Sequence, residues 1–322
     1  MKKLIVSPSP HEISDVSTRK IMLTVIIALI PAIIAGCVFF GLRALLVIAV
    51  CSASSVFFEY ISRIIMKREQ TTDDLSALLT GILLGLNLPV TIPFWIAIVG
   101  SFIAVVIVKQ LFGGLGQNFA NPAITARIVL LVSFSGAMTN WAVPMYWKAS
   151  DIANDITNSQ IIVTGATPLV SRDASLFDLF IGNTGGCIGE TSALALLIGG
   201  LFLIIRKVIS PSTPVAYIGT VSLLTLIYGG NVPYELLSGG LLLGAFFMAT
   251  DYVTTPVTEP GKIIFGIGCG IITFIIRQFG SYPEGVSFSI LLMNILTPYI
   301  DKFTMTKPLG ALITKKEDKE NA

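Results

Sequence analysis

The feature that most constrains the fold of this chain is a series of apolar stretches close to the length of a membrane-spanning helix. Such a helix requires about 20 apolar residues. Hydrophobic residues make up 53% of the 322 residues and charged residues only 12%, so the sequence predicts an all-α polytopic membrane protein. We expect ten spans, at residues 20–40, 42–66, 75–90, 94–112, 122–140, 187–207, 212–229, 235–250, 261–279 and 286–304.

The third and eighth stretches are shorter than the others and are interrupted by glycine. They contain the sequences LLTGILLGLNLP and SGGLLLGAFFMATD. Short, interrupted segments are typical of broken helices that line a site near the middle of a membrane. We therefore expect these two segments to lie beside a functional site.

The two halves of the sequence resemble each other. LTGILLG ending at Gly85 aligns with SGGLLLG ending at Gly244, and the stretch from Pro93 aligns with that from Pro260. Five helices in each half would turn the second copy upside down, which predicts a 5+5 inverted repeat. Chance likeness between glycine- and leucine-rich spans is the alternative. The predicted order is tail, five-helix unit, loop, five-helix unit and tail, at 1–19, 20–140, 141–186, 187–304 and 305–322.

The distribution of basic residues predicts the orientation. An even number of spans puts both termini on one side, and the positive-inside rule assigns that side to the cytoplasm. The loop at 141–186 is then expected outside the cytoplasm. The amino terminus lacks a small-residue cleavage site after an apolar stretch, so we expect it to be retained. Of the 21 basic residues, the ones that would lie outside are Arg43, Lys148, Arg172 and Arg277.

Composition also excludes several functions. The net charge of +2, without a basic stripe, argues against binding to nucleic acid. The four cysteines have no C-x-x-C spacing and the single histidine is His11. Iron–sulfur, zinc or two-histidine haem ligation by this chain alone is therefore not expected. A redox role would need an organic cofactor or a partner's metal.

The predicted loop contains the motif TGATP, which ends at Pro168. Proline favours extended backbone at the preceding Thr167, and Gly165 and Ala166 add little bulk beside its hydroxyl. We expect Thr167 to be presented at the surface, where the hydroxyl could accept a phosphoryl-bearing group. An ordinary polar turn is the alternative.

A second motif, GGLGQNFANPAITAR, places three glycines before Asn118 and Asn121. Glycines allow close backbone approach to a planar or phosphorylated ligand, and the amides supply donors and acceptors. Arg127 follows about one turn into the next predicted helix, where an arginine is expected to have a partner. A glycine-rich turn with an asparagine cap is the alternative.

A third motif, FFMATDYVTTPV, puts Thr250 and Asp251 at the end of the short eighth span. A carboxylate at the end of a broken helix, surrounded by hydroxyls, could hold a metal cation or a proton. A solvated aspartate in an interfacial turn is the alternative.

These motifs, together with DDLSALLTGILLGLNLP and in register, resemble one family. They are similar to the D subunit of the Rnf-type ion-translocating ferredoxin:NAD oxidoreductase and its homologue, the B subunit of the sodium-translocating NADH:quinone oxidoreductase. The resemblance implies a ten-helix fold akin to urea-type channels. It also implies FMN joined to Thr167 by a phosphoester, with Thr164, Gly165 and Ala166 recognised by a flavin transferase, and riboflavin as a second flavin. Ile161 stands where family members often have aspartate.

The function implied is that of a membrane flavoprotein that relays electrons in a complex coupling redox chemistry to Na⁺ or H⁺ export. Its expected partners are the A, B, C, E and G subunits, a flavin transferase and membrane lipid. The nicotinamide and iron–sulfur chemistry would lie on those partners, because this chain has no complete active site of its own. The short segment before the first span favours the Rnf-type protein. A component of the quinone-reducing pump and a passive small-solute channel of the same fold are the alternatives.

Overall fold

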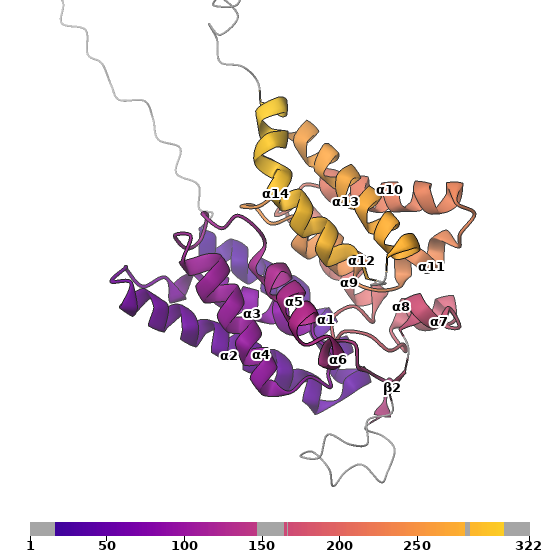
Figure 1. The fold of residues 1–322 in the computed structure, drawn as a ribbon, viewed down its shortest axis with the longest axis horizontal. Helices are drawn as coiled ribbons and strands as arrows, with labels where there is room; N and C mark the ends of the chain where they lie inside the picture. The colour runs from indigo at the N-terminus through magenta and orange to yellow at the C-terminus, as the bar shows by residue number, and fades with distance from the viewer. Residues whose placement is uncertain (1–16, 147–163, 166, 281–283, 306–322) are drawn as a thin grey trace, which may run out of the picture.

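The computed structural model describes residues 17–146, 164–165, 167–280 and 284–305. The predictions for Ile161 and Ala166, for almost all of both tails and for much of the central loop lie outside these residues. The described part is mainly helical (Figure 1). Its one sheet is an antiparallel pair, in which β1 (Trp141–Ala142) is bonded to β2 (Thr164–Gly165).

The helices of the first half of the chain run from α1 to α6. Two of them form one continuous rod, because α4 passes directly into the π-helical stretch η2. Their bounds are α1 Thr18–Phe40, α2 Leu42–Ile65, η1 Thr72–Asp74, α3 Ser76–Leu86, α4 Phe94–Phe102, η2 Ile103–Gln110, α5 Pro122–Ser133 and α6 Ser135–Met138.

The helices of the second half include two very short pieces that again form one rod, α12 followed by the π-helical η4. The bounds are α7 Pro168–Ser171, α8 Leu176–Ile181, α9 Ala193–Ile205, α10 Ser212–Ile227, α11 Val232–Leu237, α12 Leu241–Leu243, η4 Gly244–Met248, α13 Glu259–Phe279 and α14 Val286–Thr304.

The outer surface is apolar where a water-soluble protein would be polar. Helix α1 has exposed apolar side chains at helical spacing, which form one stripe along it. Among the described residues, α1, α2 and α13 are long and apolar enough to cross a membrane, and five further apolar helices are shorter. These features confirm a helical membrane protein. The α1 stripe consists of Leu23, Ile27, Ile30, Ile34 and Val38.

The two segments predicted to be short and broken are indeed so. Helix α3 has only 11 residues and ends before Asn87, and α12 has three residues before the backbone becomes π-helical. Glycine allows α3 to lie against α2, since a Cβ at Gly81 would come within 2.6 Å of the Ser52 Cα atom. The prediction of interrupted helices is therefore confirmed.

Helices from the two halves pack in matching positions. Helix α1 packs on α9, and α5 packs on α14. In Figure 1 the first half, in indigo to magenta, lies below the second half, in orange and yellow. The beginning of α1 and the end of α14 point towards the upper side of this view, whereas β2 lies at the lower side.

Candidate functional site

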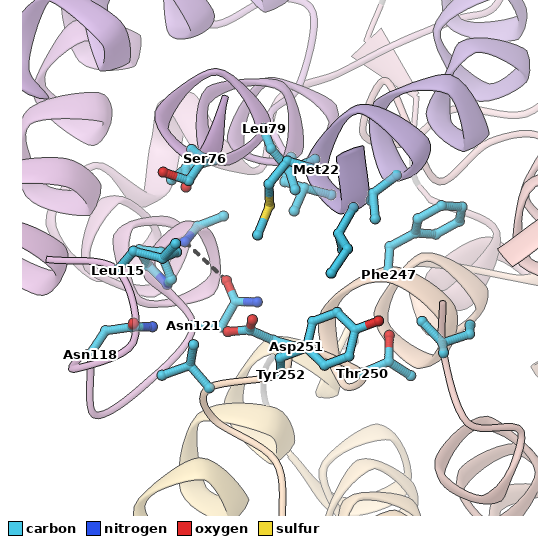
Figure 2. A pocket seen from close by; sticks show the side chains of 18 of the residues that line it. Met22, Ser76, Leu79, Leu115, Asn118, Asn121, Phe247, Thr250, Asp251 and Tyr252 are labelled. Carbon is cyan, nitrogen blue, oxygen red and sulfur yellow. Dashed lines mark hydrogen bonds between the residues drawn. The ribbon is translucent and has the colours of Figure 1, made fainter. Parts of the chain in front are cut away.

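One candidate site is a cavity between the two halves, with about 780 Å³ of unfilled space when the open solvent at its mouth is included. Apolar residues of α1, α3 and η4 form much of its wall (Figure 2). Both the asparagine motif and the Thr250–Asp251 motif line this cavity, so two sites predicted separately are one. Its polar lining residues are Ser76, Thr80, Lys109, Asn118, Asn121, Thr250 and Asp251.

Asn118 and Asn121 make different hydrogen bonds at this cavity. The Asn121 side-chain oxygen caps α5 by accepting from the backbone of Ala123 at 3.1 Å, and its amide donates to the Met248 carbonyl at 3.3 Å. The Asn118 amide donates to the nearby Ala120 carbonyl at 3.1 Å. Asn121 therefore caps α5, as the alternative interpretation of the sequence predicted, and it also links α5 to η4. Within the described part of the chain, the hydrogen bond of Asn118 stays inside its own loop.

The Asp251 carboxylate is held by the turn that follows η4. The Thr254 hydroxyl donates to its Oδ2 atom at 3.2 Å, and the Thr255 hydroxyl donates to its carbonyl at 2.6 Å. The Thr250 hydroxyl instead donates to the Phe246 carbonyl at 2.7 Å. Burial raises the pKa of the Asp251 carboxyl, because the charged form loses water. The cation site predicted here stays a prediction, with Asp251 as its better-placed ligand.

Lys109, which lines the cavity, belongs to a buried ion pair that was not predicted. The Lys109 ammonium donates to both Glu59 carboxylate oxygens, at 2.9 and 3.1 Å, and to the Ser76 hydroxyl at 2.6 Å. Glu59 is fully buried in α2. A lone acid inside an apolar span was the available signal, because such a group is normally paired and functional.

Arg127 does not line the cavity with the asparagines; it lies deeper, at the junction of the halves. Its guanidinium donates to the Asn87 side chain at 3.2 Å and to the Ser287 hydroxyl at 2.9 Å, and it forms an ion pair with Glu284. Glu190 lies 4.0 Å away. The expected partner is therefore confirmed, although the acids that provide it come from the second half and were not predicted.

Thr167 is buried, and the prediction of a presented side chain was wrong. Its backbone is extended, at φ −66° and ψ 153°, as Pro168 predicted, but the side chain is only 4% exposed. The Tyr234 hydroxyl donates to the Pro168 carbonyl at 2.9 Å and holds the start of α7 against the second half. Local spacing could not predict this burial, because it arises from residues far away in the chain.

The rest of the TGATP motif is described only in part. The backbones of Thr164 and Gly165 form β2 and pair with β1, whereas Ala166 lies outside the described residues. A small cavity beside Thr167 is also lined by Glu190 and Glu284, the acids that face Arg127. The motif therefore borders the junction between the halves.

A helical chain with an apolar outer stripe and charges buried between its halves is a polytopic membrane protein with a polar interior. More narrowly, the chain belongs to the NQR2, RnfD, RnfE family, which it matches over residues 5–310. This membership confirms the resemblance stated from the four motifs.

Three relatives show how far the similarity extends. The chain is 49% identical, over 98% of both chains, to the D subunit of the Na⁺-translocating ferredoxin:NAD⁺ oxidoreductase complex of Acetobacterium woodii. It is 43% identical to the D subunit of the proton-translocating ferredoxin:NAD⁺ oxidoreductase complex of Clostridium ljungdahlii, over 95% of this chain and 96% of the relative. It is 37% identical to the D subunit of the ion-translocating oxidoreductase complex of Stutzerimonas stutzeri, over 91% and 92%.

Proposed function

We propose that this chain is the D subunit of an Rnf-type ferredoxin:NAD oxidoreductase and relays electrons while the complex exports Na⁺ or H⁺. The observation that carries the proposal is similarity over nearly the whole length to relatives named as the D subunit of such an ion-translocating complex. Because its cysteines lack C-x-x-C spacing, we assign iron–sulfur and nicotinamide chemistry to the partners, the A, B, C, E and G subunits.

Covalent FMN at Thr167 is part of this proposal and is supported by the TGATPL motif. The conformation of the segment around Thr167 leaves no room for FMN attached to its side chain. The Thr167 side chain is buried, and the small cavity beside it is lined by Glu190 and Glu284, which would repel a phosphoester. Attachment therefore requires the segment around Thr167 to turn outward before a flavin transferase reaches the hydroxyl.

Mass spectrometry of the peptide that contains Thr167 tests the attachment. In protein made beside the flavin transferase, we expect that peptide to carry the added mass of FMN and Thr167→Ala to lose it. Thr184→Ala is the matched control, because Thr184 is a buried threonine that lines the same small cavity. Unmodified wild-type peptide, or flavin retained covalently by Thr167→Ala, would contradict the assignment.

A second flavin, riboflavin, is proposed for the large cavity. Cavities that bind such ligands are mostly apolar with a few placed polar groups, and this one has that composition. The Asn118 amide and the apolar wall of α1 would hold the ring. A bound flavin supplies one-electron chemistry, while the protein sets its surroundings.

We also propose that the two halves are inverted repeats with both termini in the cytoplasm. Matching contacts support this, because α1 meets α9 and α5 meets α14. The stretches from Pro93 and Pro260 each contain a basic residue followed by glutamine, Lys109–Gln110 and Arg277–Gln278. Both basic residues have a buried partner acid, because Lys109 pairs with Glu59 at 2.9 Å and Arg277 pairs with Glu235 at 3.2 Å. In Figure 1, the beginning of α1 and the end of α14 lie opposite β2, in agreement with this topology.

A passive channel of the same fold is the competing function, and bound flavin distinguishes the two. Visible absorption and in-gel fluorescence of denatured, washed protein should reveal a flavin that survives denaturation. Colourless protein made beside the transferase would favour the channel. Quinone as electron acceptor is tested separately, by adding ferredoxin or quinone to the purified complex.

A further inference from the structure

Two segments from different halves of the chain form much of the polar wall of the large cavity. Asn118 and Asn121 belong to the asparagine loop, residues 113–121, which precedes α5. Thr250 and Asp251 belong to the Asp251 turn, residues 250–255, which follows η4. Figure 2 shows side chains of both segments around this cavity. Groups that contact one ligand must be held at a fixed separation, so the contacts that join these segments determine the geometry of the site.

Asn294 of α14 joins the two segments from behind the cavity wall. It is 2% exposed and is not one of the residues that line the cavity. With the amide oriented to match its neighbours, its oxygen accepts from the Asn121 backbone amide at 3.1 Å. Its nitrogen donates to the Thr254 carbonyl at 3.1 Å and to the Ile290 carbonyl at 3.3 Å. One buried side chain therefore contacts both segments at once.

The link continues through Thr254 to the Asp251 carboxylate. The Thr254 hydroxyl donates to the Asp251 Oδ2 atom at 3.2 Å, while the carbonyl of the same residue accepts from Asn294. The Thr297 hydroxyl also donates to this carbonyl at 2.9 Å, and its other contact is the Met293 carbonyl of its own helix. Thr297 thus fixes the turn within the second half, whereas Asn294 also connects the turn to the first half.

The hydrogen-bonding groups of Asn294 are used within the protein. An asparagine amide has two donor hydrogens and one acceptor oxygen, and here two carbonyls and one backbone amide match them. A buried amide without such partners would be costly inside an apolar helix. Asn294 therefore acts on the cavity through Asn121 and Thr254, and it is not itself a group that binds a ligand.

We propose that Asn294 is a positioning residue, which holds the asparagine loop and the Asp251 turn in register so that both face one ligand. Its consequence for flavin binding rests on the riboflavin site proposed above. Without the Asn294 amide, the bond from the Asn121 side chain to the Met248 carbonyl, at 3.3 Å, would remain as a link between the asparagine loop and the second half. Asn118 and Asp251 would then be free to shift relative to each other.

A distance measurement tests this joint without any ligand. In a Cys37→Ala background, Gln117→Cys and Val257→Cys place spin labels on the asparagine loop and just after the Asp251 turn, both at exposed positions. The other native cysteines are buried. Double electron–electron resonance on the full-length, unflavinylated chain in lipid nanodiscs gives the distance between the labels. We expect one narrow distribution in this parent protein and a wider or shifted one in Asn294→Leu, which removes the amide at similar volume.

A second variant covers the case in which Asn294→Leu does not fold. Asn294→Ser keeps a small polar side chain that is too short to contact both segments. The distance distribution of Asn294→Ser should therefore change in the same way as that of Asn294→Leu.

Riboflavin binding tests what the joint does for the site. Riboflavin is added to the flavin-free chain, and binding is followed by quenching of its fluorescence. We expect Asn294→Leu to raise the dissociation constant about tenfold, the loss that corresponds to one hydrogen bond worth about 1.4 kcal/mol. Thr297→Val is the matched control, because it removes the neighbouring bond to the same Thr254 carbonyl while the hydrogen bonds it loses lie within the second half. This control should keep the parent distance and the wild-type affinity.

The proposal is wrong if the Asn294 variants keep the parent distance distribution, or if Thr297→Val changes distance and affinity as much as Asn294→Leu does. It is also wrong if the distances change while riboflavin binding stays at the wild-type level. A wild-type chain that binds no riboflavin, with distances that change as expected, would exclude riboflavin from the large cavity and would still support the positioning role of Asn294.

Discussion

Several charged residues inside this protein form ion pairs, and the Glu59–Lys109 pair shows what each partner contributes. Both side chains are at most 3% exposed. Removing one member of such a pair leaves the other charged and without its partner, which usually costs about 3–5 kcal/mol. Most of this loss in unfolding free energy comes from burying the remaining charge without a partner, and less comes from the lost attraction between the two charges. Single and double variants can separate the two contributions.

Glu59→Gln should therefore lower the unfolding free energy by about 3–5 kcal/mol, while the double variant Glu59→Gln with Lys109→Met should recover much of the loss. Chemical unfolding in mixed micelles measures both. The surface pair Glu259–Lys262 serves as control, because Glu259 is 58% exposed and its replacement by glutamine should cost at most about 1 kcal/mol. Equal losses for the two single variants would contradict this account.

The two cavity asparagines should also respond differently to substitution. Asn121→Ala removes a helix cap and should destabilise the protein by about 1 kcal/mol. Asn118→Ala should leave stability nearly unchanged but reduce the riboflavin recovered from acid-treated protein. Thermal unfolding and flavin fluorescence measure the two effects. Riboflavin retention by Asn118→Ala at the wild-type level would remove Asn118 from the proposed site.

For single residues, the sequence could predict which side chains need a partner, but it could not predict which residues would surround them. Arg127 was expected to have a partner because a charge inside a span needs one, and it has several. The identity of Glu190 and Glu284 could not be predicted, because both come from the other half of the chain. Thr167 was misjudged for the same reason, since its burial depends on long-range packing.

Among the helices, glycine controls how closely neighbours approach. A Cβ at Gly81 of α3 would meet backbone atoms of α2, the Ser52 Cα atom at 2.6 Å and the Cys51 carbonyl oxygen at 2.7 Å. Backbone cannot move aside as a flexible side chain can. The two helices must therefore separate if any side chain is introduced at this position.

Gly81→Ala should destabilise the protein by about 1–3 kcal/mol, the usual cost of overpacking. Gly219→Ala in α10 is the matched control, because an added Cβ there meets no atom within 4 Å. Alanine favours helix over glycine by about 1 kcal/mol, so this control should be neutral or stabilising. Thermal unfolding of the two variants should thus show shifts of opposite sign or clearly different size.

Interrupted helices could be predicted only where glycines divide an apolar stretch. The glycines of α3 and of η4 indicated short segments, and the structure agrees. The predicted span 187–207 is different, because its helix begins only at Ala193. Residues 187–192, Cys-Ile-Gly-Glu-Thr-Ser, form an irregular turn before this helix, and Glu190 and Thr191 face the junction there. The apolar residues on either side gave no sign of this turn.

The whole molecule has a proposed orientation that labelling can test. In a Cys37→Ala background, Phe177→Cys in α8 should react with a membrane-impermeant maleimide in intact cells, because this side chain is 70% exposed on the proposed outer side. Lys67→Cys, at an exposed position after α2, should react only after permeabilisation. The reverse pattern would show that the chain is inserted the other way.

The junction around Arg127 also determines where a membrane voltage acts. On α5, Ala123 lines the large, partly open cavity, and Arg127 faces the acids of the small cavity only four residues later. That separation is about 6 Å along the helix. Voltage falls mainly across the layer that excludes water. The small cavity is largely enclosed, so this layer begins near Ala123 and includes Arg127 and its acids. A unit charge that crosses it would then gain or lose most of the roughly 2.3 kcal/mol available per 100 mV.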